Sequence, residues 1–191
     1  MKARMSFLLL LFLCLGLPSL FAQKKASFEF RAGAAFPLEQ LGETDLKTGF
    51  GFEGIFDYRF LPHLSAYAGW GWNQFTTEEA NSDMDVEETG YLFGLQFNHP
   101  IGNGPLSYYI RVGGLYNHLE LENKAGDIVN DSGHGLGYRI GIGVDLALTE
   151  NIHLRPGVKY QSLSRDVTIE TSPVAMDHNY FAASLGIGFD F

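Results

Sequence analysis

Apolar and polar residues alternate one by one along most of the chain after residue 25. In the closing run SLGIGFDF, residues 184–191, every second residue is apolar, and the last residue is Phe191. A period of two is typical of a β-strand whose two faces differ in environment. The pattern predicts about eight strands, within the runs 27–36, 49–60, 64–75, 88–99, 106–117, 135–148, 152–162 and 181–191.

Short and long connections alternate between these runs. The short ones lie at 61–63, 99–105 and 149–151, and the long polar ones at 37–48, 76–87, 120–134 and 166–178. Antiparallel strands with short turns at one end and long loops at the other predict a closed up-and-down barrel. Runs of this length also suit tilted strands in a bilayer, which need about 9 to 11 residues. Pro156 predicts a bulge or an edge, because proline cannot donate to a strand ladder.

Two barrels fit this outline, and they differ in where the apolar face points. A soluble lipocalin-like carrier turns it inward, whereas a membrane barrel turns it toward lipid. The glycines favour the membrane barrel, because they fall on the polar face, where a narrow lumen needs room for larger side chains. They are Gly33, Gly49, Gly51, Gly69, Gly71, Gly90, Gly94, Gly113, Gly137, Gly141, Gly143, Gly157, Gly186 and Gly188.

Aromatic residues support the same orientation. Tyr and Trp gather near strand ends on the apolar face, as in the aromatic girdles of membrane barrels. A terminal strand with Phe189 and Phe191 also resembles the signal read by outer-membrane assembly machinery. Residues 26–191 together resemble the small outer-membrane β-barrel family, which includes OmpA transmembrane domains, OmpX and PorT-like proteins. The resemblance implies an all-β transmembrane barrel of about eight strands, surrounded by outer-membrane lipid and lipopolysaccharide.

The first 22 residues are typical of a cleavable signal peptide. Lys2 and Arg4 precede the apolar stretch FLLLLFLCLGL, and cleavage is predicted between Ala22 and Gln23. The chain therefore divides into a signal peptide, 1–22, and a barrel domain, 23–191, with the signal segment expected as a separate helix outside the barrel. Cys14 lies within the signal peptide, and the bulky residue before it disfavours a lipoprotein.

Composition narrows the possible functions. The chain of 191 residues carries a formal net charge of −9, and loss of Lys2 and Arg4 would take it to −11. An acidic exported protein is a poor nucleic-acid binder, because that affinity depends on neutralising phosphates. Cys14 is the single cysteine, so the mature chain has neither a disulfide framework nor thiol chemistry. The sequence predicts no cofactor.

Acidic and basic residues in near-equal number occupy the polar face of the predicted strands. Because unpaired charges would be costly in a lumen flanked by lipid, we expect them to pair across it. An eight-stranded barrel is filled by side chains, which favours a structural plug over an ion-selective pore lining. We place Arg111 and Arg139 at the centre, with Glu53 and Asp145 as partners. The other network members are Glu29, Arg31, Asp57, Arg59, Arg155 and Lys159.

Candidate chemistry outside the lumen is weak. His63 and Ser65 match the His-x-Ser pair of lipid A deacylases, but they lie at a short turn, on the opposite side from lipid A. His118, His134 and His178 lie near the long loops with Asp131, Asp177, Ser132 and Ser172, without a triad spacing. We therefore predict no catalytic residue.

One acidic segment resembles a calcium loop. Asp83, Asp85 and Glu87 alternate within NSDMDVEE, but Val86 replaces the glycine that an EF-hand needs. These three residues are weak candidates for divalent metal binding, and an acidic loop facing solvent is the simpler interpretation.

The sequence as a whole predicts a structural or interaction role through the long external loops. That role is envelope integrity, adhesion, or service as an accessory to secretion or assembly, with a possible protein partner at the loops. A narrow pore for small ions or solutes is the first alternative, and a lipid-modifying enzyme of the outer leaflet is the second.

Overall fold

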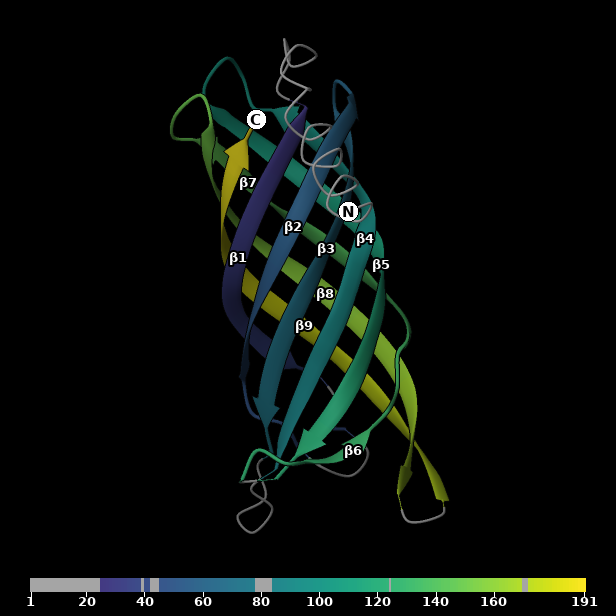
Figure 1. The fold of residues 1–191 in the computed structure, drawn as a ribbon. Coiled ribbons are helices and arrows are strands. Elements are labelled where there is room, and N and C mark those ends of the chain that lie inside the picture. The colour runs from purple at the N-terminus through teal and green to yellow at the C-terminus, as the bar shows by residue number, and fades with distance from the viewer. Residues whose placement is uncertain (1–24, 39, 42–44, 78–83, 124, 170–171) are drawn as a thin grey trace, which may run out of the picture.

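The computed structural model describes residues 25–191 apart from 39, 42–44, 78–83, 124 and 170–171, so the predicted signal segment lies outside the described residues. Within these residues nine strands form, and eight of them close into one antiparallel barrel (Figure 1). The strands are β1 (Ala26–Pro37), β2 (Gly49–Leu61), β3 (Leu64–Thr76), β4 (Asp85–Pro100), β5 (Leu106–Glu122), β6 (Ile128–Asp131), β7 (Gly135–Ala147), β8 (Ile152–Ile169) and β9 (Ser172–Asp190).

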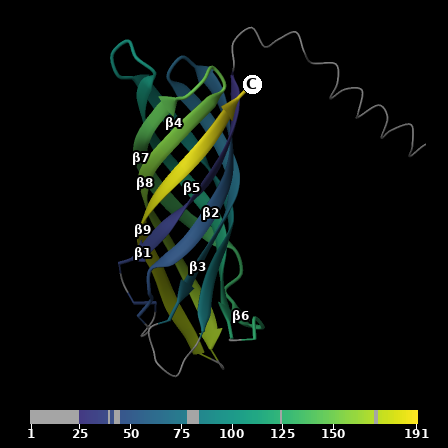
Figure 2. The ribbon, with the colours of Figure 1, turned by 90° about the vertical axis from the view of Figure 1, so that its left-hand side faces the viewer.

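The barrel closes where its first strand meets its last. β1 pairs with both β2 and β9, and β4 pairs directly with β5, so no barrel strand is left with an open edge. The closing register sets Phe28 opposite Phe189 and Pro37 opposite Tyr180. Figure 2 shows β9 and β1 side by side along the wall. The prediction of a closed up-and-down barrel of eight strands is confirmed.

The two ends of the barrel differ as the alternation of connections predicted. β1 begins and β9 ends at the end with short turns, which we call the turn end; β6 lies at the opposite, loop end (Figure 1). The hairpin turn between β2 and β3 and the connection between β7 and β8 both lie at the turn end. Among the described residues no helix has the length and apolar character needed to cross a membrane.

The apolar face of the strands points outward. Phe30, Leu185 and Ile140 each expose about half of their surface, although their neighbours Glu29 and Arg139 are buried. A soluble protein would not leave such a continuous apolar surface in water, whereas a bilayer covers it. The inverted arrangement of a lipocalin-like carrier is therefore excluded.

Several strands run further than the alternating runs predicted. β8 and β9 stay paired as far as Ile169 and Ser172, so the long loop predicted over 166–178 is wrong. Within the predicted loop 120–134, β5 continues to Glu122 and the short strand β6 pairs back onto it. In these extensions the alternation continues with the opposite sense, because the outward His118 and Glu120 are polar whereas the inward Leu119 is buried. A strand pattern defined by apolar outward residues ends at this reversal, which explains why the strand extensions were missed.

Pro156 interrupts one ladder without shifting its register. The β7–β8 pairs stop at Gly143 with Gly157 and resume at Leu146 with Leu154 in the same register. Pro156 still lies opposite Leu185 of β9. The predicted bulge or edge is therefore wrong, because the strand absorbs the missing donor as a local gap in pairing.

The loop end of the lumen holds an apolar core. Phe75, Leu119 and Tyr180 are fully buried there. The rest of this cluster is Ala35, Leu41, Leu46, Val86, Leu163 and Ala182, with Leu121 packed against it. The interior therefore changes from charged to apolar along the barrel axis.

Candidate functional site

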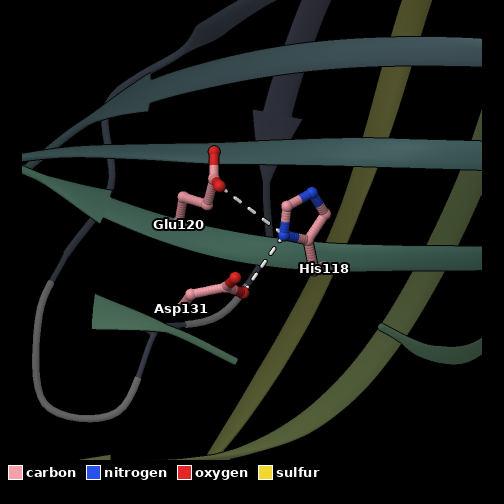
Figure 3. A group of neighbouring side chains, drawn as sticks. All are labelled: His118, Glu120 and Asp131. Carbon is pink, nitrogen blue, oxygen red and sulfur yellow. Dashed lines mark hydrogen bonds and ion pairs between the residues drawn. The ribbon is translucent and has the colours of Figure 1, made fainter. Parts of the chain in front are cut away.

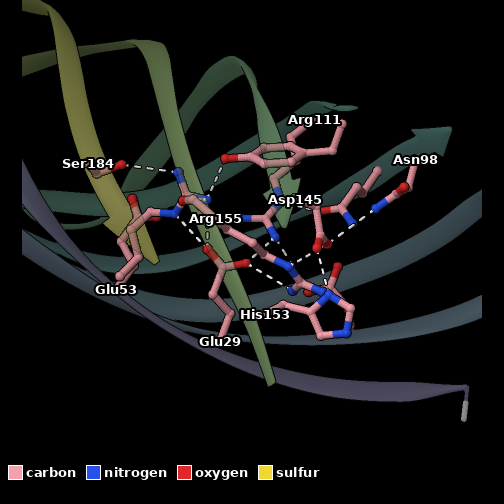
Figure 4. A network of polar contacts seen from close by, with 12 residues as sticks. Glu29, Glu53, Asn98, Arg111, Asp145, His153, Arg155 and Ser184 are labelled. Atoms are coloured by element: carbon pink, nitrogen blue, oxygen red, sulfur yellow. Dashed lines mark hydrogen bonds and ion pairs between the residues drawn. The ribbon is translucent and has the colours of Figure 1, made fainter. Parts of the chain in front are cut away.

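The centre of the lumen is organised around Glu29, whose side chain is fully buried. Its carboxylate contacts three guanidinium groups: Arg31 at 2.7 Å, Arg111 at 2.6 Å and Arg155 at 3.2 Å (Figure 4). These residues come from β1, β5 and β8, so the cluster crosses the lumen. Arg31 also donates to the Tyr109 hydroxyl at 2.6 Å. Charge-assisted contacts of this length are the strong class of hydrogen bond.

A second cluster lies toward the turn end. Arg155 donates from Nε to Asp145 at 2.8 Å, and Nδ1 of His153 lies 2.6 Å from the other oxygen of Asp145 (Figure 4). Nε2 of His153 faces Asp190 of β9 at 3.3 Å. Arg155 therefore links this cluster to Glu29, and the two clusters form one continuous network.

Two further carboxylates continue the lumen toward the loop end. Glu53 pairs with Arg139 at 3.0 Å and with the ammonium of Lys159. Glu88 is fully buried and accepts hydrogen bonds from neutral groups on three strands. Its donors are Asn117 at 2.6 Å, Gln161 at 2.6 Å and Tyr180 at 2.9 Å.

These clusters leave little free space. One gap, lined by Arg31, Glu53 and Lys159, and another, lined by Asp57, Gln96 and Asp190, hold about 10 Å³ each. Each volume accommodates about one water molecule. A wider cavity of about 630 Å³ lies at the turn end, where Arg59, Glu150 and His153 contribute to its lining. The lumen is thus open at its mouth and narrow within.

Most of the residues predicted to form the charge network lie in the lumen, but some of them have other partners than we expected. Arg139 meets Glu53, as we proposed from the sequence, but Asp145 contacts Arg155 and His153 instead of a central arginine. Arg111 contacts Glu29 and lies 3.5 Å from Asp57. Arg59 differs from the expectation, because its side chain is exposed at the turn end.

Some residues that contact the charge network were not predicted as part of it. Tyr109 and Tyr67 are buried beneath the Arg111 guanidinium, which lies 5.2 and 5.5 Å from their ring centroids. His178, which we assigned to a solvated loop, is buried against Phe75 and Tyr180. His178 lies two residues before Tyr180 on β9, and residues two apart on a strand share a face. This spacing could have predicted that both side chains point into the lumen.

A separate polar cluster lies on the outer face of the loop end. Nδ1 of His118 on β5 is 3.1 Å from Asp131 on β6 and 3.7 Å from Glu120 on β5 (Figure 3). Desolvation raises the pKa of Asp131, but the backbone N–H of Gly133 and the His118 ring outweigh it and leave this pKa below its usual value. Desolvation, together with Glu87, Glu120 and Asp85, raises the pKa of Glu122.

The other residues considered for catalysis or metal binding are scattered. His63 is exposed and its Nδ1 lies 2.9 Å from the main-chain oxygen of Asn98, whereas Ser65 is buried on the lumen side of β3. Ser132 uses its hydroxyl to accept from the backbone N–H of Leu119 and to donate to the carbonyl of Gly133. These contacts do not assemble a nucleophile with a base.

The candidates of the acidic segment are held by strand neighbours. Asp83 lies outside the described residues. The side chain of Ser172, a candidate nucleophile, is also outside the described part of the chain. Asp85 and Glu87 belong to β4 instead of a loop; Asp85 accepts from Gln74 and Thr76, and Glu87 from Trp72. Glu87 lies close to Glu120 and Glu122 of β5.

Comparison with known proteins identifies the class. The sequence matches the family described as outer membrane protein beta-barrel domain over residues 7–191, and the protein belongs to this family. A closed barrel with an apolar exterior and a charge-paired lumen agrees with that assignment. The family and the fold imply an outer-membrane location. No curated protein matches the sequence.

Several solved outer-membrane proteins share the fold. Neisserial surface protein A is 15% identical with a TM-score of 0.61, and the alignment covers 88% of this chain and 98% of that one. OprG from Pseudomonas aeruginosa is 16% identical with a TM-score of 0.58, covering 88% and 97%. Ail, the attachment invasion locus protein of Yersinia pestis, is 16% identical with a TM-score of 0.52, covering 87% and 99%. At these identities the likeness concerns the fold.

Proposed function

We propose that the protein is a plugged outer-membrane barrel that acts through its external surfaces and does not conduct solutes. Its role is envelope integrity, adhesion, or service as an accessory to secretion or assembly. The observation that carries the proposal is the Glu29 cluster, in which one carboxylate holds Arg31, Arg111 and Arg155 across the lumen.

Two barriers in series support a closed lumen. The gaps beside the charged clusters hold about 10 Å³ each, which is less than a hydrated ion needs. Toward the loop end, Phe75, Leu119 and Tyr180 fill the lumen with apolar surface, and a dry constriction opposes ion entry. An ion would have to break the charge pairs and then cross this apolar core.

Single-channel recording tests the proposal directly. Residues 23–191 are refolded, folding is checked by a heat-dependent gel shift, and the protein is added to a planar bilayer. We expect a silent bilayer, because the plug stays in place. Reproducible conductance steps whose ion preference changes in Arg111→Ala would overturn the proposal in favour of a narrow pore.

The proposal includes no catalytic step. His63 is engaged with a backbone carbonyl and Ser65 is buried, so the His-x-Ser resemblance does not produce a solvent-facing pair. Mass spectrometry of lipid A from cells with and without the gene tests this part. An unchanged lipid A mass is expected, and loss of one acyl chain in cells that carry the gene would contradict it.

We also propose how the protein is exported and what it contacts in the outer membrane. The signal peptide is removed between Ala22 and Gln23, and assembly machinery reads the terminal strand with Phe189 and Phe191. Lipid and lipopolysaccharide then surround the barrel. The exposed outer face of Phe189 and Phe191, and the acidic residues at the loop end, support these contacts.

A further inference from the structure

The outer face of β4 and β5 changes character toward the loop end. Tyr91 and Tyr116 lie opposite each other and are exposed, as expected for an aromatic girdle. One and two outward positions further along β5 the same face carries His118 and Glu120. This polar cluster therefore begins where the lipid-facing surface ends, outside the lumen.

The cluster brings an imidazole and two carboxylates together from two strands. Nδ1 of His118 lies 3.1 Å from Asp131 and 3.7 Å from Glu120, and the three ligand atoms lie within 4.8 Å of one another (Figure 3). Ligands bound at about 2.0 Å around a tetrahedral Zn²⁺ are separated by about 3.3 Å. The two distances from His118 lie on either side of that value, and the two carboxylate oxygens are at most 4.8 Å apart, so a central ion requires only modest side-chain movements.

The ligands are held in position by neighbouring groups. The ring of His134 stacks on the ring of His118 at 4.3 Å, with an angle of 15° between the planes. The backbone N–H of Gly133 donates to Asp131 at 2.8 Å. Such second contacts orient metal ligands and reduce the cost of binding.

Like charges concentrate around Glu120. The strand register sets Glu120 directly opposite Glu87 on β4 and Asp131 on β6, and Asp85 opposite Glu122. Like charges in directly opposed positions destabilise a sheet. Within the described part of the chain, no lysine or arginine forms an ion pair with these carboxylates, and a bound cation would supply the missing positive charge.

A simple ion pair between His118 and Asp131 accounts for only part of this arrangement. It would place a single positive charge beside two carboxylates, Asp131 and Glu120, while Glu120 also faces Glu87 and Glu122. A divalent ion between the three ligands compensates both Asp131 and Glu120. The set of donor atoms favours Zn²⁺ over Ca²⁺ and Mg²⁺. Ca²⁺ and Mg²⁺ prefer oxygen ligands alone, whereas Zn²⁺ binds both imidazole and carboxylate.

We propose that His118, Glu120 and Asp131 form a Zn²⁺ site that fastens β6 to the edge of β5 at the loop end. The ion takes Nδ1 of His118 and one oxygen from each carboxylate, and its fourth position is open to water or an outside ligand. By joining β5 to β6, the metal would order the external connection between β5 and β7.

The test is a Zn²⁺ titration of refolded residues 23–191, in competition with a chromophoric chelator. We expect one equivalent of Zn²⁺ and at least a tenfold loss of affinity in His118→Gln, Glu120→Gln and Asp131→Asn. His99→Gln and Asp127→Asn are the matched controls, because both residues are exposed and lie outside the cluster. The heat-dependent gel shift verifies that every variant is folded.

A second measurement reports on the fastening itself. Amide hydrogen exchange within 128–131 should slow on addition of Zn²⁺ in the wild type and not in Asp131→Asn. The proposal is overturned if millimolar Zn²⁺ does not bind, if His99→Gln abolishes binding, or if the three ligand variants bind as tightly as the wild type. Binding of Ca²⁺ that depends on Glu122 but not on His118 would instead assign the ion to the Glu87, Glu120 and Glu122 group.

Discussion

At the residue scale, the lumen depends on a carboxylate that no solvent reaches. Glu29 contacts Arg31, Arg111 and Arg155, and none of these residues is more than slightly exposed. Burial of four charges is favourable only when their hydrogen bonds are satisfied. If the Glu29 carboxylate is removed, the three guanidinium groups stay buried without the negative charge that they share.

Glu29→Gln should therefore lower the free energy of unfolding by about 3 kcal/mol, the lower part of the range for breaking a buried pair. Equilibrium unfolding in urea, followed by the fluorescence of Trp70 and Trp72, measures the change. Asp127→Asn, an exposed acid on the β5–β6 connection, is the control and should leave the unfolding midpoint unchanged. Equal midpoints for Glu29→Gln and the wild type would show that the cluster contributes little to stability.

At the element scale, strands that do not pair still touch across the lumen. Tyr109 of β5 reaches over Gly143 of the neighbouring β7 to Gly157 of β8, and its hydroxyl lies against both glycines. A methyl group at either glycine would overlap that hydroxyl. The glycines on the polar face thus let a large side chain from β5 lie flat over the two strands next to it, β7 and β8.

Gly157→Ala should destabilise the barrel by about 1–3 kcal/mol, the usual cost of overpacking. Gly104→Ala, at a turn where an added methyl group meets no neighbour within 4 Å, should have a much smaller effect. If the Tyr109 hydroxyl causes the clash, Tyr109→Phe in the Gly157→Ala background should cost less than it does in the wild type. Additive effects in this double-mutant cycle would remove Tyr109 as the cause.

At the scale of the whole molecule, closure depends on the last strand. The backbone N–H of Phe191 donates to the carbonyl of Ala26 at 2.9 Å, while the Phe191 side chain points outward and is about half exposed. Backbone pairing therefore closes the barrel, and the side chain remains accessible to lipid or to assembly machinery. The two roles can be separated by substitution.

Phe191→Ala should leave refolding in detergent unchanged but reduce the amount of folded protein in the outer membrane severalfold. The reason is that the substitution keeps the backbone bond and removes the terminal aromatic side chain. Phe181→Ala is the matched control, because Phe181 lies on the same strand with a similar exposure of 49%. Quantification of folded protein in membrane fractions decides the outcome, and an equal loss in both variants would contradict a terminal signal.

Much of the architecture could be predicted from alternation alone. Strands such as 184–191 were recognised because residues two apart share a face, and that rule needs no knowledge of neighbouring strands. The orientation of the faces followed from the glycines, since Gly143 and Gly157 share the polar side of their strands. The extension of β8 and β9 to Ile169 and Ser172 was missed, because toward the loop end inward residues such as Leu163 and Tyr180 join the apolar core and the sense of the alternation reverses.

The partners inside the lumen were decided by tertiary structure. Arg111 and Arg155 lie 82 and 126 residues from Glu29, and only the closed barrel brings them to one carboxylate. His178 and Tyr180 carry polar groups in a stretch that resembles a loop, yet β9 places both inside the barrel. The sequence by itself determined the strands, the outward face and the class of protein, because these depend on a local period of two. The pairing of charges and the cluster at His118 depend on closure and register, which bring together residues far apart in the chain.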